Sequence, residues 1–247
     1  MFKLVKYELR GNLFTILGIC ITLIIANLLL LTRIDSWGID VVGGFSILLG
    51  IGAIIVIFIF SLNIMSKYLH QDSGYLLFTL PRSGTSIIMS RLITSLIQIT
   101  LVILVSFLCA YLLIGEDIPL EFSKYFKIYG MVLIEYIYRV ISFLTFIYFC
   151  MIIGKVAFRN KKIGKIGSFV VFILLILFIG WIQTKILILF PQTINITKLI
   201  GSTTIGANQT DILSYVEINI AMKISSISTT IILFMSGSYL LDKKVDL

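Results

Sequence analysis

The strongest constraint on this chain is a series of long uncharged stretches, separated by short segments that contain most of its charged residues. Residues 11–32, 41–66 and 92–115 contain no aspartate, glutamate, lysine or arginine. A charged side chain is costly at the centre of a lipid bilayer, and a helix needs about 20 mostly apolar residues to cross it. Each of these stretches is therefore long enough for one membrane-spanning helix.

Three further apolar stretches complete the pattern. The fourth is interrupted by two charged residues, the fifth by one lysine, and the sixth is the shortest. Only 13% of the chain is charged, against about a quarter in soluble proteins, which excludes a soluble globular domain. We predict an all-α polytopic membrane protein, a single transmembrane domain over residues 1–247, with six spans at about 12–32, 41–65, 92–114, 128–153, 166–190 and 221–241.

The distribution of lysine and arginine predicts the orientation of the spans. Most of these residues flank the membrane on the side that holds both termini and the basic segment 155–165. Cytoplasmic flanks are enriched in lysine and arginine, so we predict that both termini lie in the cytoplasm. The net charge of +8 belongs to these flanks and not to a basic folded face, so we expect no binding to nucleic acid.

The first ten residues place Phe2, Val5 and Leu9 on one helical face, with basic residues elsewhere. This pattern predicts a short amphipathic elbow helix in the cytoplasmic interface, before the chain turns into the membrane. The other interpretation is a basic, frayed start of the first span.

The longest cytoplasmic connection, between the second and third spans, contains an apolar segment at residues 72–81 that is too short to cross the membrane. Asp72 or Ser73 can cap the start of a short helix, and Pro81 can end it. Its apolar side chains occupy both faces, so they need a cover. That cover is the membrane interface, the spans themselves or a cytosolic partner.

Glu135 and Arg139 lie four residues apart within the fourth span. This spacing places them on one helical face, where they can form an intramembrane ion pair. Ionisable residues inside a membrane are candidate functional residues, and the alternative is a structural clamp between spans. The segment 191–220 before the last span is polar, and we expect it to form short interfacial or re-entrant helices.

Several types of active site are missing from the sequence. There is no G-x-x-x-x-G-K-[ST] motif to bind a nucleotide phosphate, so an energy source must come from another chain. His70 is the single histidine, which argues against intramembrane proteases and zinc enzymes that need histidines. The three cysteines lie in apolar runs without metal-binding spacing. We expect no enzymatic, metal or cofactor site in this chain.

The layout resembles the permease subunits of export-type ABC transporters, the ABC-2 superfamily, and especially small Gram-positive permeases for amphipathic peptides, toxins or lantibiotics. The resemblance rests on the basic start, the six spans, the segment Asp-Ser-Gly-Tyr-Leu-Leu-Phe-Thr-Leu-Pro at 72–81 and the long outer segment before the last span. In that family the loop after the second span forms a coupling helix that docks into the ATPase. The corresponding residues here are Asp72, Gly74, Tyr75, Leu76, Leu77, Phe78, Leu80 and Pro81.

The resemblance also implies the partners. They are a separate ABC ATPase subunit that binds ATP and magnesium, a second permease copy that completes a dimer, membrane lipids and an amphipathic or hydrophobic peptide substrate. The implied location is the bacterial cytoplasmic membrane. Two other functions are compatible with the sequence: an ATP-independent secondary transporter or channel, and a non-transporting membrane protein that confers immunity to a peptide.

Overall fold

The computed structural model describes residues 2–70, 83–114, 122–157, 161–195 and 217–243. Nearly all of them lie in helices, and six of the helices are long and apolar enough to cross a membrane. These candidate spans are Lys3–Leu31, Ile39–Leu69, Gly84–Leu113, Gly130–Ala157, Gly167–Leu189 and Ile220–Lys243. The prediction of a helical chain with six helices long and apolar enough to cross a membrane is confirmed. The sixth, predicted to be the shortest, continues through 24 residues.

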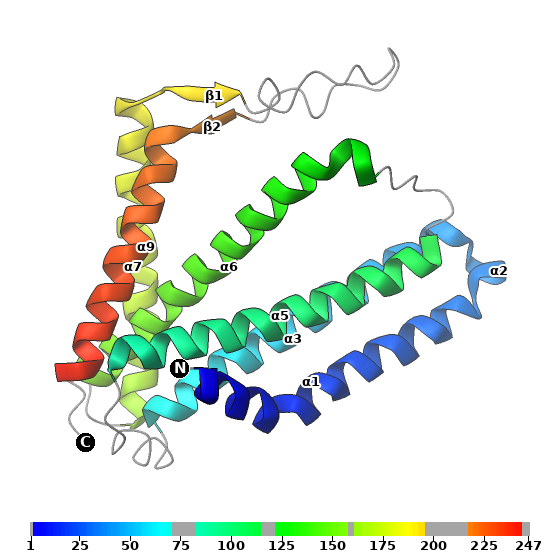
Figure 1. The fold of residues 1–247 in the computed structure, drawn as a ribbon, viewed down its shortest axis with the longest axis horizontal. Coiled ribbons are helices and arrows are strands. Elements are labelled where there is room, and N and C mark those ends of the chain that lie inside the picture. The colour runs from blue at the N-terminus through cyan, green and yellow to red at the C-terminus, as the bar shows by residue number, and fades with distance from the viewer. Residues whose placement is uncertain (1, 71–82, 115–121, 158–160, 196–216, 244–247) are drawn as a thin grey trace. The chain divides into compact units, whose positions relative to one another are not determined.

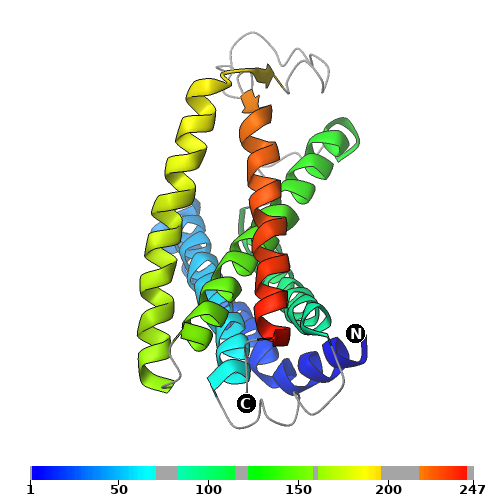
Figure 2. The same ribbon diagram turned by 90° about the vertical axis from the view of Figure 1, so that its left-hand side faces the viewer.

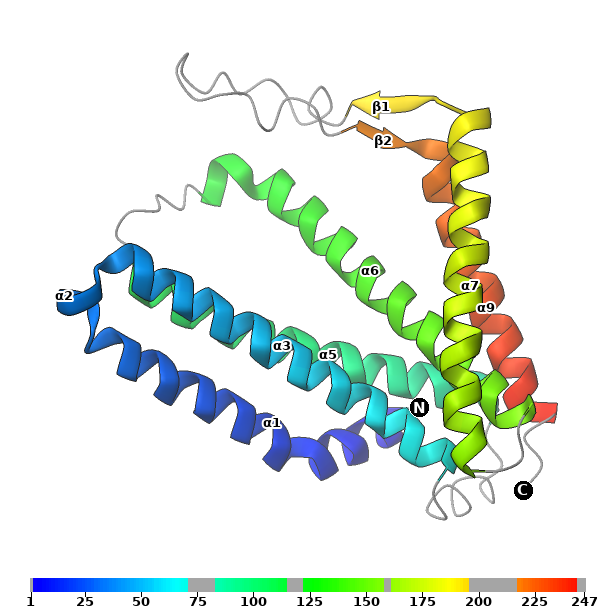
Figure 3. The same ribbon diagram turned by 180° about the vertical axis from the view of Figure 1, so that it is seen from behind.

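The described helices form two compact units, of which the first comprises residues 1–121. It contains α1 (Phe2–Leu31), the short α2 (Ile34–Trp37), α3 (Ile39–His70) and α5 (Gly84–Ile114). Figures 1 and 3 show α3 and α5 running side by side. Gly38 allows the chain to turn between α2 and α3, because its φ of 80° lies in a region that favours glycine.

Close packing brings α3 against α5. A Cβ atom added at Gly50 would lie 3.3 Å from Cβ of Ser106. One turn earlier in α3, the buried Ser46 donates a hydrogen bond of 2.6 Å to Oδ1 of the buried Asn27 in α1. Small residues allow helix backbones to approach in a membrane, and side-chain hydrogen bonds connect them. Ser46 and Gly50 therefore belong to helix contacts of the first unit.

The start of α1 differs from the predicted elbow. Residues 2–31 form one continuous helix, and Figure 1 shows a bend close to its N-terminal end. The amphipathic first residues are thus the beginning of the first span's own helix and not a separate element. A position of these residues in the membrane interface stays a prediction.

The second unit contains α6 (Phe122–Ala157), α7 (Lys161–Leu189) and α9 (Ile220–Lys243). Figure 2 shows α7 and α9 side by side. Strands β1 (Thr193–Asn195) and β2 (Glu217–Asn219) pair in antiparallel register, Thr193 with Asn219. The described ends of the segment expected to form interfacial or re-entrant helices are therefore extended, and residues 196–216 lie outside the described residues.

Asn219 joins the end of α7 to the start of α9. Its Nδ2 donates a hydrogen bond of 2.6 Å to the carbonyl oxygen of Phe190, just beyond the end of α7. Its Oδ1 accepts a hydrogen bond of 2.9 Å from the backbone N–H of Met222. The first N–H groups of a helix lack partners within the helix, and an asparagine side chain at the cap supplies one. Asn219 therefore caps α9 and also satisfies a carbonyl after α7.

Candidate functional site

The residues proposed for docking lie outside the described residues: Asp72, Gly74, Tyr75, Leu76, Leu77, Phe78, Leu80 and Pro81. The structure does describe the two helix ends that flank them. At the end of α3, Tyr68 and Leu69 are buried, and near the start of α5, Ile87 and Ile88 are buried. The connection at 71–82 is therefore attached on both sides to well-packed helices.

A buried ion pair connects these helix ends to α1. Arg91 Nη1 of α5 lies 3.3 Å from Glu8 Oε1 of α1, and both side chains are about nine-tenths buried. Thr94 Oγ1 donates a hydrogen bond of 3.0 Å to the other Glu8 oxygen. The Arg91 guanidinium also lies 5.3 Å from the centre of the Tyr68 ring in α3. One arginine of α5 thus contacts both other long helices of the first unit.

Sequence reasoning missed this pair. Glu8 lies within the amphipathic first ten residues and Arg91 lies directly before the uncharged stretch 92–115, and neither is among the candidate residues of the sequence analysis. The available signal was the spacing of Arg91, Thr94, Ser95 and Gln98, which places four polar residues on one face of an apolar helix. All four are buried.

The polar face of α5 continues to Gln98, which is fully buried. Its side-chain oxygen and nitrogen have no hydrogen-bond partner among the described residues, and neither has the hydroxyl of the fully buried Ser61 in α3. Tyr68 and Arg91 are in contact across two antiparallel helices. Ser61 lies seven residues before Tyr68, and Gln98 lies seven residues after Arg91, which is about two helical turns in each case. Ser61 and Gln98 therefore lie at the same level of the α3–α5 contact, and unpaired buried polar groups weaken the packing there.

The second charged cluster lies in the second unit. Arg139 Nε donates a hydrogen bond of 2.8 Å to Glu135 Oε1, the i,i+4 pair that the sequence suggested. Lys223 Nζ of α9 donates to Glu135 Oε2, and the same ammonium lies 4.3 Å from the centre of the Tyr138 ring. Lys223 is not among the candidate residues of the sequence analysis. One carboxylate therefore serves two cations.

Hydroxyl contacts extend this cluster along the α6–α9 interface. Tyr138 Oη lies 2.6 Å from Ser226 Oγ, and Ser142 Oγ lies 2.9 Å from Thr230 Oγ1. Each of these pairs, like Glu135 and Lys223, is separated by 88 positions in the sequence. A constant separation means that α6 and α9 run parallel and in register. We call these three pairs the α6–α9 polar ladder.

No group of histidine, cysteine, aspartate or glutamate residues in the described part of the chain could hold a metal ion. Cys20, Cys109 and Cys150 are free and buried, so they act as small apolar side chains. The two charged clusters connect helices within each unit, and the Arg139 side chain is 77% exposed.

No protein-family model matches this chain, and no curated protein or solved structure matches it significantly.

Proposed function

We propose that this chain is the permease subunit of an ATP-driven exporter of the ABC-2 type, and that it moves amphipathic or hydrophobic peptides across the bacterial cytoplasmic membrane. ATP hydrolysis belongs to a separate ABC ATPase subunit, and a second permease copy completes the translocation path. The six apolar helices support a multi-pass membrane protein. The absence of a phosphate-binding motif from the sequence supports a division of labour between two chains.

The observation that carries the proposal is the Glu8–Arg91 ion pair, which lies beside the two helix ends that flank residues 71–82. A docking loop must pass its movement to the helices that line the path. Arg91 lies seven residues into α5, binds Glu8 of α1 and covers the ring of Tyr68, two residues before the end of α3. A force on residues 71–82 therefore acts on all three helices at this end of the unit, where Arg91 connects them.

The buried polar residues further along the α3–α5 contact support a second part of the mechanism. Gln98 and Ser61 have buried polar atoms without partners among the described residues. Separation of α3 from α5 at this level exposes these atoms to water or to a polar part of the substrate. The hydrogen bonds gained there offset part of the free-energy cost of separating the helices. We propose that the helices hinge apart here while the Glu8–Arg91 pair holds them together at the loop end.

Co-purification with the ATPase tests the function. The chain is expressed with candidate ABC ATPases from the same genome, and the complex is isolated through a tag on the permease. We expect a stoichiometric P-loop ATPase, and substitution of Leu76, Phe78 and Leu80 by serine abolishes its recovery while membrane insertion is unchanged. The matched control is Trp37→Ser with Ile39→Ser, which removes two exposed apolar side chains from the α1–α3 connection. Full complex formation by the triple variant contradicts the docking assignment.

A further inference from the structure

The cluster formed by Glu135, Arg139 and Lys223 has an excess of positive charge. Glu135 Oε1 accepts a hydrogen bond from Arg139 Nε, and Glu135 Oε2 accepts one from Lys223 Nζ. Both carboxylate oxygens are therefore engaged, and the one negative charge faces two positive charges. An unbalanced charge within an apolar span is costly, so an anion from outside this set would stabilise it.

Arg139 has the geometry to bind that anion. Its contact with Glu135 uses Nε, and its two terminal nitrogens make no hydrogen bond within the described part of the chain. The side chain is 77% exposed, whereas that of Lys223 is 30% exposed. A guanidinium presents its N–H groups as a planar fork that matches the paired oxygens of a carboxylate or a phosphate. The donors that remain on Arg139 therefore form an open anion-binding group.

The surface around Arg139 is apolar. Val132 and Phe143 lie seven residues before and four residues after Arg139, which places all three on one face of α6. Val132 is 61% exposed and Phe143 is 48% exposed. A ligand on this face needs an anionic group for Arg139 and an apolar part for the residues above and below it. That combination describes an amphiphile.

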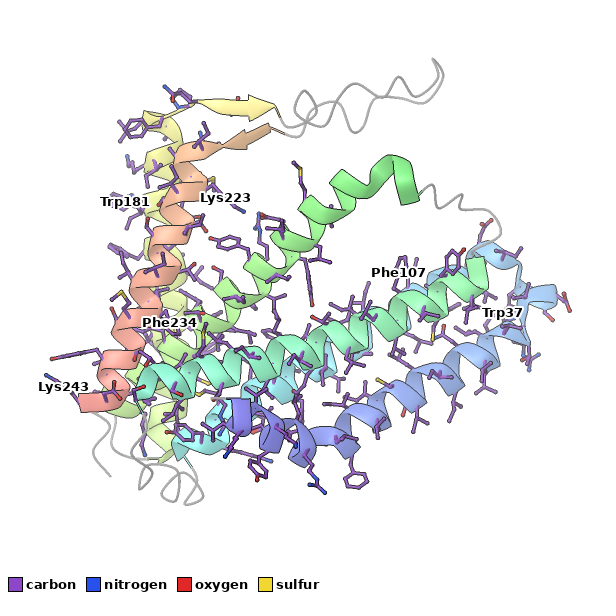
Figure 4. All side chains as sticks on the ribbon, viewed as in Figure 1. Trp37, Phe107, Trp181, Lys223, Phe234 and Lys243 are labelled. Carbon is purple, nitrogen blue, oxygen red and sulfur yellow. The ribbon has the colours of Figure 1, made fainter. Side chains whose placement is uncertain are left out.

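The position of the cations along their helices identifies the kind of amphiphile. Lys223 lies on the first turn of α9, beside the end of β2, as Figure 4 shows. Arg139 lies in the N-terminal half of the span Gly130–Ala157, and helical side chains tilt towards the N-terminus of their helix. Because α6 and α9 run parallel, both cations point towards the end of the unit that holds β1 and β2. Long basic side chains extend in this way towards lipid headgroups.

From these observations we infer that Arg139 and Lys223 bind the phosphate group of an anionic phospholipid, and that its acyl chains lie along the exposed apolar face of α6. The site goes beyond peptide export and does not depend on it. With the termini in the cytoplasm, the lipid belongs to the outer leaflet.

Lipid binding to the purified full-length protein tests the inference. Native mass spectrometry of the delipidated protein, titrated with phosphatidylglycerol, gives the affinity of each lipid bound. We expect Arg139→Gln to weaken the tightest binding by about tenfold, because it removes a charge-assisted hydrogen bond. Glu135→Gln removes the competing negative charge, so binding stays as tight or becomes tighter. Lys185→Gln is the matched control, since it removes one positive charge from α7 outside the cluster.

Two ligand comparisons distinguish the sources of the anion. Glycerol phosphate has the phosphate without acyl chains, and we expect it not to compete with phosphatidylglycerol at equal concentration. An amphipathic peptide with a free C-terminal carboxylate tests the other amphiphile. The lipid assignment is overturned if this peptide binds in a way that requires Arg139 while phosphatidylglycerol does not.

The remaining outcomes are equally decisive. Unchanged lipid affinity in Arg139→Gln refutes the site, and so does an equal loss in Arg139→Gln and Glu135→Gln. If Arg139→Gln changes the oligomeric state and leaves the lipid affinity unchanged, this face belongs to a contact with a second copy, and the lipid site is refuted. If Arg139→Gln does not fold, Arg139→Lys replaces it: this variant keeps the charge but loses the fork, and we expect it to bind phosphatidylglycerol more weakly than the wild type.

Discussion

Tyr138 Oη of α6 lies 2.6 Å from Ser226 Oγ of α9, in the middle of the α6–α9 polar ladder. The pairs on either side, Glu135 with Lys223 and Ser142 with Thr230, follow the same separation of 88 positions. Apolar side chains gain little by leaving lipid for a helix contact, so polar pairs have a large part in fixing which helix faces meet. The ladder therefore sets the register of α6 against α9.

We expect Tyr138→Phe to destabilise the second unit modestly, by about 0.6–1 kcal/mol, because Ser226 loses its partner across the interface. Unfolding of the detergent-solubilised protein by sodium dodecyl sulfate measures the change. Tyr239→Phe is the control, since that side chain is 56% exposed. In a double-mutant cycle, Ser226→Ala costs little further stability once Tyr138 is phenylalanine. Fully additive effects contradict the contact.

Removal of one partner from the Glu8–Arg91 pair is expected to be much more costly. Arg91→Met leaves the buried Glu8 carboxylate without its cation, and such a change costs about 3–5 kcal/mol. The double variant with Glu8→Gln recovers most of this loss, because no uncompensated charge remains. Thermal unfolding followed by circular dichroism gives the comparison, with the exposed Lys3→Met as control. A double variant no more stable than Arg91→Met argues against the pair.

Gly50 and Gly52 provide a matched test of helix packing in α3. A Cβ atom at Gly50 would meet Ser106 at 3.3 Å, whereas at Gly52 it would meet nothing within 4 Å. Alanine favours a helix over glycine equally at both positions, so the difference between the variants isolates the crowding. We expect Gly50→Ala to be less stable than Gly52→Ala by about 1–2 kcal/mol. Equal thermal stability of the two variants refutes the close approach.

The two hydrogen bonds of Asn219 separate in a pair of variants. Asn219→Ala removes the cap of α9 and the bond to the Phe190 carbonyl, and a lost cap costs about 0.5–2 kcal/mol. Asn219→Asp keeps the acceptor for the Met222 N–H but loses the donor to Phe190. Hydrogen exchange at the amide of Met222 should therefore be fast in Asn219→Ala and remain slow in Asn219→Asp. Equal exchange in both variants argues against the capping role.

The helices of this protein could be predicted from sequence because a single physical cost determines where they lie. Charged residues are excluded from the bilayer centre, and residues 11–31, 41–66 and 92–114 of the uncharged runs each fall within one long helix. The fourth span was recoverable despite Glu135 and Arg139, because their spacing indicates mutual compensation. The short strands β1 and β2 were not, since three residues give no detectable periodicity.

The contacts between helices could not be predicted in the same way. Glu8 and Arg91 are distant in sequence, and neither has a local pattern that names the other as its partner. Lys223 appeared to be an ordinary flanking cation, because only the parallel register of α6 and α9 brings it to Glu135. Helix contacts in a membrane depend on a few polar side chains, and one sequence does not specify which of them pair.

The pairing of β1 with β2 and the hydrogen bond of Asn219 bring together the two chain segments that flank residues 196–216. Thr193 pairs with Asn219 in the sheet, and the Asn219 side chain bonds to the Phe190 carbonyl. These contacts of the joint between α7 and α9 are made by residues outside 196–216. This makes residues 196–216 a suitable place to insert an epitope tag, which would report on which side of the membrane this end of the protein is exposed without disturbing the helices beneath it.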